Sequence, residues 1–386
     1  MGYRSMVKLE GATGAKMSTA IGRAVGCCTI LFALCACGPQ EPIRIGVIAG
    51  LSDRGSDFGQ SVRDGVILAV ENQNRAGGIQ GRRIELVVRD DGQNKDQAIR
   101  SAQELIDLRP EIVIGPVTSS MAAVILPLMN QAGQVMISPT VASTDFYGKD
   151  DYFFRVNRSS REAAEDHAQV VFKRGARRVA MAFDTSNRTY SDAWVREFSN
   201  AFRALGGEVV EAAGFDSQSS PSFSETIRKM LASKPDWLLF VASSIDTVRL
   251  SQQSYRLAPG LPRSTTEWAA SGEVLVEMGG AEVDGLVFSH AYDREDMSEE
   301  FRRFRSDFKS RFQRDIGSFS PIAYDTANVV MAALAKRTRN ESVKEALFKY
   351  GPYQGLQQKI EFDRNGDASR TVYFTEIRAG KFVQFR

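Results

Sequence analysis

Short apolar runs alternate with longer amphipathic stretches along most of the chain, and this alternation limits its fold more than any other feature. Residues 44–49 form a run typical of a buried strand, and residues 60–75 then repeat apolar side chains at helical spacing before two glycines. Further strand-like runs follow at residues 84–88, 112–115 and 135–138, with helix-like stretches between them. Such alternation is typical of a parallel sheet covered by helices on both faces. We therefore predict an α/β unit in this part.

The same alternation begins again after residue 155 and predicts a second α/β unit. Its expected strands are residues 178–183, 208–212 and 237–241, with helix-like stretches before and after each of them. The C-terminal part differs, because its two strong helical patterns have no strand-like neighbours. We expect these helices to complete the two units, and we expect a strand-like tail after them. The two helices are predicted at residues 298–312 and 321–336, and the tail at residues 359–386.

Composition and charge exclude several classes of protein. The chain has 386 residues, of which 43% are hydrophobic and 25% charged, as in ordinary globular proteins, so disorder and collagen are excluded. Its 49 Lys and Arg residues nearly balance 47 Asp and Glu residues, which argues against a protein that binds nucleic acid by neutralising phosphates.

The cysteines lie only near the N-terminus, so the rest of the chain holds no disulfide framework. They are Cys27, Cys28, Cys35 and Cys37. Most of them stand in the apolar stretch of residues 24–36, which is too short for the ~20 residues that a membrane span needs. Basic residues precede this stretch and small residues end it, as in a secretory signal. No histidine lies nearby, which argues against a zinc site.

The end of the apolar stretch, residues 34–38 (LCACG), resembles the bacterial lipobox, in which the last cysteine is diacylated and becomes the mature N-terminus. We therefore expect residues 1–36 to be a lipoprotein signal peptide, Cys37 to be the lipidated residue, and residues 37–42 to be an extended tether. An ordinary cleaved signal and an uncleaved anchor are the alternatives. Met17 is a second candidate for the start of the chain.

Motifs of catalysis are missing from the sequence. It contains no G-x-S-x-G elbow and no Walker loop, and its two histidines, His167 and His290, are far apart. His167 is expected in the middle of a helix, at a surface or an interface. Residues 77–81 predict a helix stop and turn, and residues 363–367 predict a tight turn, because their glycine is misplaced for a calcium loop. We therefore predict no enzyme, no metal and no cofactor.

Polar residues recur where expected strands end and helices begin. Residues 116–120 and residues 138–144 each follow a strand and offer hydroxyl and backbone N–H groups. In open α/β sheets ligands bind at this edge, and a helix N-terminus favours an anion such as a carboxylate. The alternative interpretation is that Ser119 or Ser120 only caps the helix.

Short motifs follow one another in a characteristic order along nearly all of the chain that remains after the signal. They are residues 45–52, 65–81, 90–91, 114–116 and 137–139, Asp184 with Tyr190, and residues 279–280, 284–285, 323–325 and 362–363. Together they resemble bacterial type I solute-binding proteins of the leucine/isoleucine/valine type, which feed ABC importers. The resemblance implies the periplasmic binding protein type I fold, in which two doubly wound parallel-sheet lobes, joined by three crossovers, close over a solute.

The resemblance also implies a division of the chain and a set of partners. The lobes would be residues 43–157 with 290–367, and residues 158–289 with 368–386. The expected partners are a small solute and the membrane subunits of an ABC permease, with no nucleic acid. The protein would be a monomer in the periplasm or at the cell exterior, anchored through Cys37. A module that presents its closed form to a membrane sensor is the alternative to transport.

Several site residues follow from the resemblance, position by position. The aromatic wall of the family's site matches Phe58. Its carboxylate-binding serine matches Ser119, with Thr118 and Ser120 beside it. The tyrosine of the second lobe, which packs over the ligand, matches Tyr190.

A second loop of the family also holds the carboxylate, through backbone N–H and hydroxyl groups. It matches Thr140, Val141 and Ala142. The family's usual threonine is replaced by Ala142, and the hydroxyls of Thr140 and Ser143 are expected to compensate.

The residues around the ligand's amine depart from the family. The position of the family's acid falls on Trp268, with Glu267 beside it, and an expected tyrosine is replaced by Ser243 and Ser244. A buried ammonium needs a paired anion. Either Glu267 fills that role and the ligand is an amino acid, with the branched-chain type favoured, or the ligand is an amine-free acid or amide on which Trp268 can stack.

Overall fold

The computed structural model describes residues 41–52, 56–269 and 272–385, and residues from Ile43 onward form one compact unit. Cys37 and the expected signal peptide lie outside the described residues. Of the helices in the described part, none is long and apolar enough to cross a membrane.

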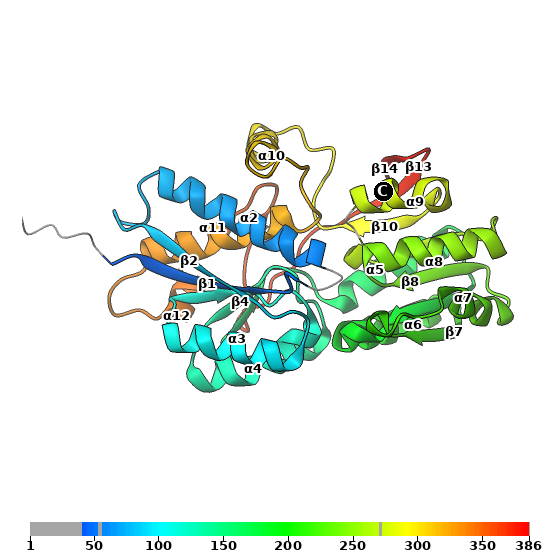
Figure 1. Cartoon of the computed structure of the whole chain (residues 1–386), viewed down its shortest axis with the longest axis horizontal. Helices are drawn as coiled ribbons and strands as arrows, with labels where there is room; N and C mark the ends of the chain where they lie inside the picture. Colours follow the sequence, from blue (N-terminus) through cyan, green and yellow to red (C-terminus); the bar gives the residue numbers. More distant parts are fainter. Residues whose placement is uncertain (1–40, 53–55, 270–271, 386) are drawn as a thin grey trace, which may run out of the picture. The chain divides into compact units, whose positions relative to one another are not determined.

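The first sheet has five parallel strands in the order β2-β1-β3-β4-β5. The strands are β1 (Ile43–Ala49), β2 (Ile84–Asp90), β3 (Ile112–Ile114), β4 (Met136–Ser138) and β5 (Phe153–Arg155). Every residue of the interior strand β1 except Arg44 is buried, as the apolar run predicted. Helices cover both faces (Figure 1), with α2 (Ser56–Arg75) and α11 (Ser320–Lys336) on one side, and α3 (Lys95–Leu108) and α4 (Ser119–Ala132) on the other.

The second sheet has seven strands in the order β14-β13-β10-β9-β8-β6-β7. They are β6 (Arg178–Asp184), β7 (Glu208–Phe215), β8 (Trp237–Val241), β9 (Arg263–Thr265), β10 (Val287–His290), β13 (Tyr373–Arg378) and β14 (Lys381–Phe385). The first five are parallel, and β13 and β14 form an antiparallel hairpin at one edge. The hairpin turns at Ala379 and Gly380, which both have a positive φ.

The helices of this second unit also form two layers around their sheet. They are α5 (Ser160–Lys173), α6 (Arg188–Ala204), α7 (Phe223–Ala232), α8 (Ser244–Leu257) and α9 (Gly272–Gly279). Helices α5 and α6 share one hydrophobic cluster with β6 and β8, whereas α7 and α8 share another with the same strands. The predicted strands at residues 178–183, 208–212 and 237–241 are thus confirmed as β6, β7 and β8.

The expectation that the two C-terminal helices complete both units is wrong, because both pack against α2 of the first unit. Helix α10 (Glu299–Phe312) buries Phe301, Phe304 and Phe308 in a cluster with Leu68 of α2 and Tyr324 of α11. The second sheet instead gains its edge from β13 and β14.

The strand-like tail predicted for residues 359–386 is confirmed, although it forms three separate strands and not a continuous one. The chain forms α12 (Val343–Lys349), the short strands β11 (Tyr353–Gln354) and β12 (Lys359–Ile360), and then turns before β13. The predicted tight turn is confirmed, because the side chain of Asp363 accepts hydrogen bonds from the N–H groups of Asn365 and Asp367. Asp367 in turn pairs with the fully buried Arg155 at the end of β5.

The surface or interface position expected for His167 is also wrong. Its side chain is 1% exposed and packs against Trp194, Phe198 and Phe374. Burial lowers the pKa of the imidazole to about 3, so this histidine is a neutral core residue at ordinary pH.

Three stretches of chain connect the two sheet units, and they lie between β5 and α5, between β10 and α10, and before β13. The third is fixed by Arg370, whose guanidinium pairs with the carboxylate of Asp325 at 2.7 Å while both side chains are buried. Burial raises the pKa of Asp325, and the neighbouring Arg370 opposes that shift. A buried pair of this kind fixes the connection, because either charge alone would be costly.

Candidate ligand-binding site

Loops at the carboxyl ends of parallel strands from both sheets line two adjoining pockets. We call them the small chamber, with about 290 Å³ of empty space, and the large chamber, with about 700 Å³, open solvent included in both. The small chamber is lined by Phe58, Val117, Ser119, Thr140, Asn157, Asn187, Tyr190, Glu267, Trp268 and Phe319. The large chamber is lined by Gly50, Phe58, Gly59, Gln93, Val117, Thr118, Asp184, Ser186, Asn187, Ser217, Gln218, Ser243, Ile245, Asp246 and Trp268. The two chambers share four lining residues, which shows that they adjoin.

Phe58 stands at the start of α2 and lines both chambers. Its ring meets that of Phe319 edge to face, with 4.6 Å between the ring centroids. The next residue is a glycine because a Cβ at Gly59 would collide with the carbonyl oxygen of Gly50. This close approach of α2 to the end of β1 holds the aromatic ring at the pocket.

The start of α4 forms one polar wall of the small chamber. Thr118 is the N-cap of this helix, since its hydroxyl oxygen accepts a hydrogen bond from the N–H of Met121 at 3.4 Å. Capping therefore does not engage Ser119, which is 2% exposed, lines the chamber, and accepts a hydrogen bond from the N–H of Ser143 at 3.3 Å. A hydroxyl at a helix N-terminus is suited to an anion.

Ser120 lies elsewhere, although it is the next residue. Its N–H donates to the side-chain oxygen of Asn187 at 3.1 Å, and its hydroxyl accepts from the N–H of Thr189 at 3.3 Å. Ser120 lines neither chamber and connects α4 of the first unit to the start of α6 in the second.

Of the second predicted loop, only Thr140 lines a chamber. Its hydroxyl donates to the carbonyl oxygen of Val117 at 2.6 Å. The N–H groups of Thr140 and Val141 both donate to the hydroxyl of Ser138, and the side chains of Val141 and Ala142 are buried in hydrophobic clusters.

Glu267 and Trp268 both line the small chamber, together with Tyr190. The Tyr190 hydroxyl donates a hydrogen bond of 2.8 Å to the Glu267 carboxylate, and the ring of Trp268 meets that of Tyr190 edge to face. Burial raises the pKa of Glu267, and hydrogen bonds, including the one from Tyr190, oppose this shift. Burial also raises the pKa of Tyr190, which therefore stays a hydrogen-bond donor.

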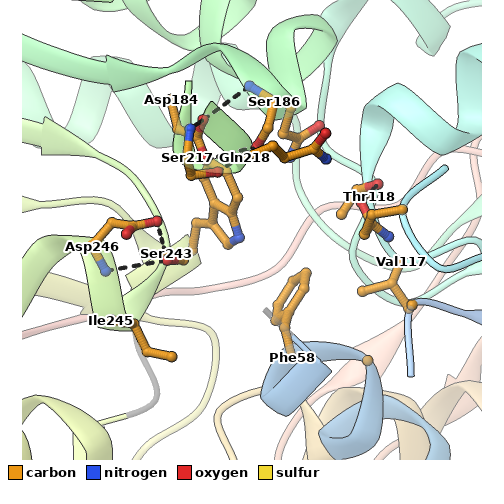
Figure 2. A pocket seen from close by; sticks show the side chains of 15 residues that line it. Phe58, Val117, Thr118, Asp184, Ser186, Ser217, Gln218, Ser243, Ile245 and Asp246 are labelled. Carbon is orange, nitrogen blue, oxygen red and sulfur yellow. Dashed lines mark hydrogen bonds between the residues drawn. The ribbon is translucent and has the colours of Figure 1, made fainter. Parts of the chain in front are cut away.

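Two aspartates with serine partners form the second-unit wall of the large chamber (Figure 2). Asp184, at the end of β6, is 1% exposed and accepts hydrogen bonds from Ser186 N–H at 2.9 Å and Ser186 Oγ at 2.7 Å. Asp246, in the first turn of α8, accepts from Ser243 Oγ at 2.9 Å. Among the lining residues described, none is Lys, Arg or His.

The structure therefore brings most of the predicted residues to the two chambers. Phe58, Ser119, Thr140, Tyr190, Glu267 and Trp268 line the small one, Thr118 and Ser243 line the large one, and Ser120, Val141 and Ala142 line neither. Sequence reasoning missed Asn187, which follows the end of β6 and could have been found by the strand-edge rule. It also missed Asn157 in a crossover and Phe319 before α11, for which the sequence offers no such signal.

The comparisons with known proteins agree with this architecture. Residues 42–381 match the model of the periplasmic binding protein family. This chain belongs to that family. A Leu/Ile/Val-binding protein homolog of Brucella melitensis is 27% identical over 263 residues, covering 65% of this chain and 68% of the relative. A Leu/Ile/Val-binding protein of Rhizobium johnstonii is 25% identical over 358 residues, covering 88% of this chain and 93% of the relative.

Solved structures share the fold. A leucine-binding protein from Thermotoga maritima superposes with a TM-score of 0.80 at 24% identity, covering 89% of this chain and 98% of the other. A branched-chain amino acid binding protein from Streptococcus pneumoniae, in complex with isoleucine, gives 0.80 at 21% identity, covering 89% and 100%. The expected type I fold and the resemblance to the leucine/isoleucine/valine group are thus confirmed, and family membership makes this a binding protein and not an enzyme.

Proposed function

We propose that the protein is a solute-binding lipoprotein of an ABC importer that closes over a small carboxylate-bearing solute, an amino acid, and delivers it to the permease. Family membership supports solute binding outside the cytoplasm. Lipidation at Cys37, retention at the membrane, a monomeric state and delivery to permease subunits belong to the proposal. So do the lobe boundaries, residues 43–157 with 290–367 and residues 158–289 with 368–386.

One observation carries the choice of an amino acid. The small chamber combines a carboxylate, Glu267, with a hydroxyl at a helix N-terminus, Ser119, and both line a pocket of about 290 Å³. An ammonium group needs the first and a carboxylate group suits the second. These two groups define the head of an α-amino acid.

In this pose the apolar surfaces of the small chamber receive the first carbons of the ligand's side chain. Phe58, Val117 and Phe319 provide these surfaces. Relatives are named for leucine, isoleucine and valine, so the branched-chain type is the first candidate.

A second candidate is an acid without an amine, stacked on Trp268. A protein of this fold from R. palustris, 18% identical with a TM-score of 0.78, was solved in complex with benzoate.

A thermal-shift screen of the soluble form from Gly38 onward tests the proposal. Amino acids, amine-free acids and amides are added separately. A specific ligand raises the melting temperature by mass action, because at a ligand concentration of one hundred times Kd it increases the free energy of unfolding by about 2.7 kcal/mol. The proposal predicts that amino acids give the shift. A response to amine-free acids alone would exclude the role proposed for Glu267. Co-purification with permease subunits, and not with a membrane sensor, tests the delivery step.

A further inference from the structure

The hydroxyl groups of the large chamber are oriented by the carboxylates behind them. Ser217 Oγ donates to Ser186 Oγ at 3.1 Å, and Ser186 Oγ donates to Asp184 at 2.7 Å. The protons of both hydroxyls therefore point toward the Asp184 carboxylate. In the same way Ser243 Oγ donates its proton to Asp246 at 2.9 Å. These bonds are drawn as dashed lines in Figure 2. A serine hydroxyl has a single proton, so the proton that each of these bonds uses is not offered to the chamber.

The opposite wall repeats the pattern. The Thr118 hydroxyl donates to the side-chain oxygen of Gln93 at 2.8 Å, so its proton is engaged as well. The amide nitrogen of Gln93 donates to Asp91 at 3.0 Å.

The serine oxygens keep capacity to accept. A hydroxyl has two lone pairs. On Ser186 one of them receives Ser217, and on Ser243 one receives the N–H of Asp246 at 3.3 Å, which leaves each oxygen able to accept one further hydrogen bond. The large chamber therefore presents the oxygens of Ser186 and Ser243 to its contents as acceptors, beside the side-chain amides of Asn187 and Gln218.

An aliphatic group is a poor occupant of such a chamber. It would displace water from the serine oxygens without replacing the lost hydrogen bonds, which is unfavourable for buried polar groups. A site that hydrogen-bonds a ligand's OH or NH discriminates strongly against the analogue without it.

We propose that the ligand is an amino acid whose side chain ends in a hydrogen-bond donor, an amide, hydroxyl or ammonium group, which lies in the large chamber and donates to Ser186 and Ser243. The proposal rests on the proposed function, because the head of the amino acid occupies the small chamber. The side chain passes between the chambers beside their shared residues, Phe58 and Trp268. Under this proposal the protein binds polar amino acids, in contrast to the branched-chain ligands for which its relatives are named.

Titration calorimetry with pairs of equal shape tests this proposal on the soluble form from Gly38 onward. Asparagine is compared with leucine, and threonine with valine. The expected result is that the polar member of at least one pair binds ten times or more tighter than its aliphatic partner. Tighter binding of leucine and valine than of asparagine and threonine would overturn the proposal while leaving the proposed function intact. No binding of any amino acid would overturn both.

Two variants test whether the large chamber discriminates between polar and aliphatic amino acids. Ser243→Ala is expected to weaken binding of the preferred polar amino acid about tenfold and to leave its aliphatic partner within twofold. Ser243 also caps α8, so the melting temperature of the free variant is measured to show that it folds. Ser186→Ala is a second variant with the same expectation, and Ser310→Ala on the exposed side of α10 is the matched control. Equal weakening of polar and aliphatic ligands by both Ser variants would contradict the assignment.

Discussion

The small and large chambers adjoin and are built at the same edges of the same two sheets, yet they differ in chemistry. The small chamber joins aromatic walls to one buried pair, Tyr190 and Glu267, and one helix N-terminus at Ser119. The large chamber shares Phe58 and Trp268 with it but adds aspartates with serine partners, such as Asp184 and Ser186. Under the proposed binding mode, neighbouring loops at one sheet edge recognise the ligand's head and its side chain separately.

The contrast arises from what ends each strand. Residues at the ends of β6 and β8 cap the elements that follow them. Asp184 caps the short turn Thr185–Asn187, and Ser243 caps α8, each through local hydrogen bonds. After β9 the chain instead enters a short turn that carries Glu267 and Trp268. Separate bonds between the same residues engage the hydroxyl protons of the large chamber, from Ser186 Oγ to Asp184 and from Ser243 Oγ to Asp246.

The largest effect is expected from Glu267→Gln, which removes the only anion described in the small chamber. Affinity for an amino acid is expected to fall about 100-fold, or about 2.7 kcal/mol, because an ammonium group loses its paired charge. Titration calorimetry measures the loss, and Glu277→Gln on the exposed side of α9 is the matched control. An unchanged affinity would show that the small chamber does not bind the ammonium group of the ligand, so it would not differ from the large chamber in this role.

Ser119→Ala is expected to weaken binding about tenfold, or about 1.4 kcal/mol, because the ligand's carboxylate loses one hydrogen bond. The cap of α4 is Thr118, so the helix and the melting temperature of the free protein are expected to stay nearly unchanged. The calorimetric titration is compared with the thermal unfolding curve. A large loss of stability with no loss of affinity would assign Ser119 to structure.

Binding of an amino acid is expected to weaken severalfold as the pH falls, starting above the ordinary Glu range. The pKa of Glu267 is raised by burial, with Tyr190 and Arg158 opposing the shift, and its protonated form does not pair with an ammonium. Affinity is therefore full above the raised pKa and is lost as pH decreases through it. Affinities measured from pH 7 downward test this, and Glu267→Gln is expected to remove the dependence.

The smallest effect is expected from Ser120→Ala. This change removes the hydroxyl that accepts from Thr189 N–H but leaves both chambers intact, so affinity is expected to fall about threefold or less. Comparison with Ser119→Ala separates a residue that lines the small chamber from its neighbour that joins the two units. A loss as large as that of Ser119→Ala would show that both serines act through the joining of the two units, and not through contact with the ligand.

Helices and strands could be predicted from the sequence where their apolar patterns were long. The run of β1 and the helical spacing of α2 predicted both elements, whereas β9 was missed because Arg263, Ser264 and Thr265 form no apolar pattern. The predicted roles of the site residues stay predictions, although most of these residues line a chamber. The direction of the hydroxyl protons could not be predicted, because it depends on pairings such as Ser217 with Ser186 across separate loops.

Calorimetry of an amino acid and its des-amino analogue tests whether Glu267 pairs with the ligand's ammonium group. The amino acid that binds most tightly among the twenty is titrated into the soluble form, followed by the carboxylic acid of the same skeleton without the amine. We predict that the analogue binds about 100-fold more weakly, because Glu267 then has no ammonium to pair with. Equal or tighter binding of the amine-free acid would show that Glu267 does not pair with an ammonium group of the ligand.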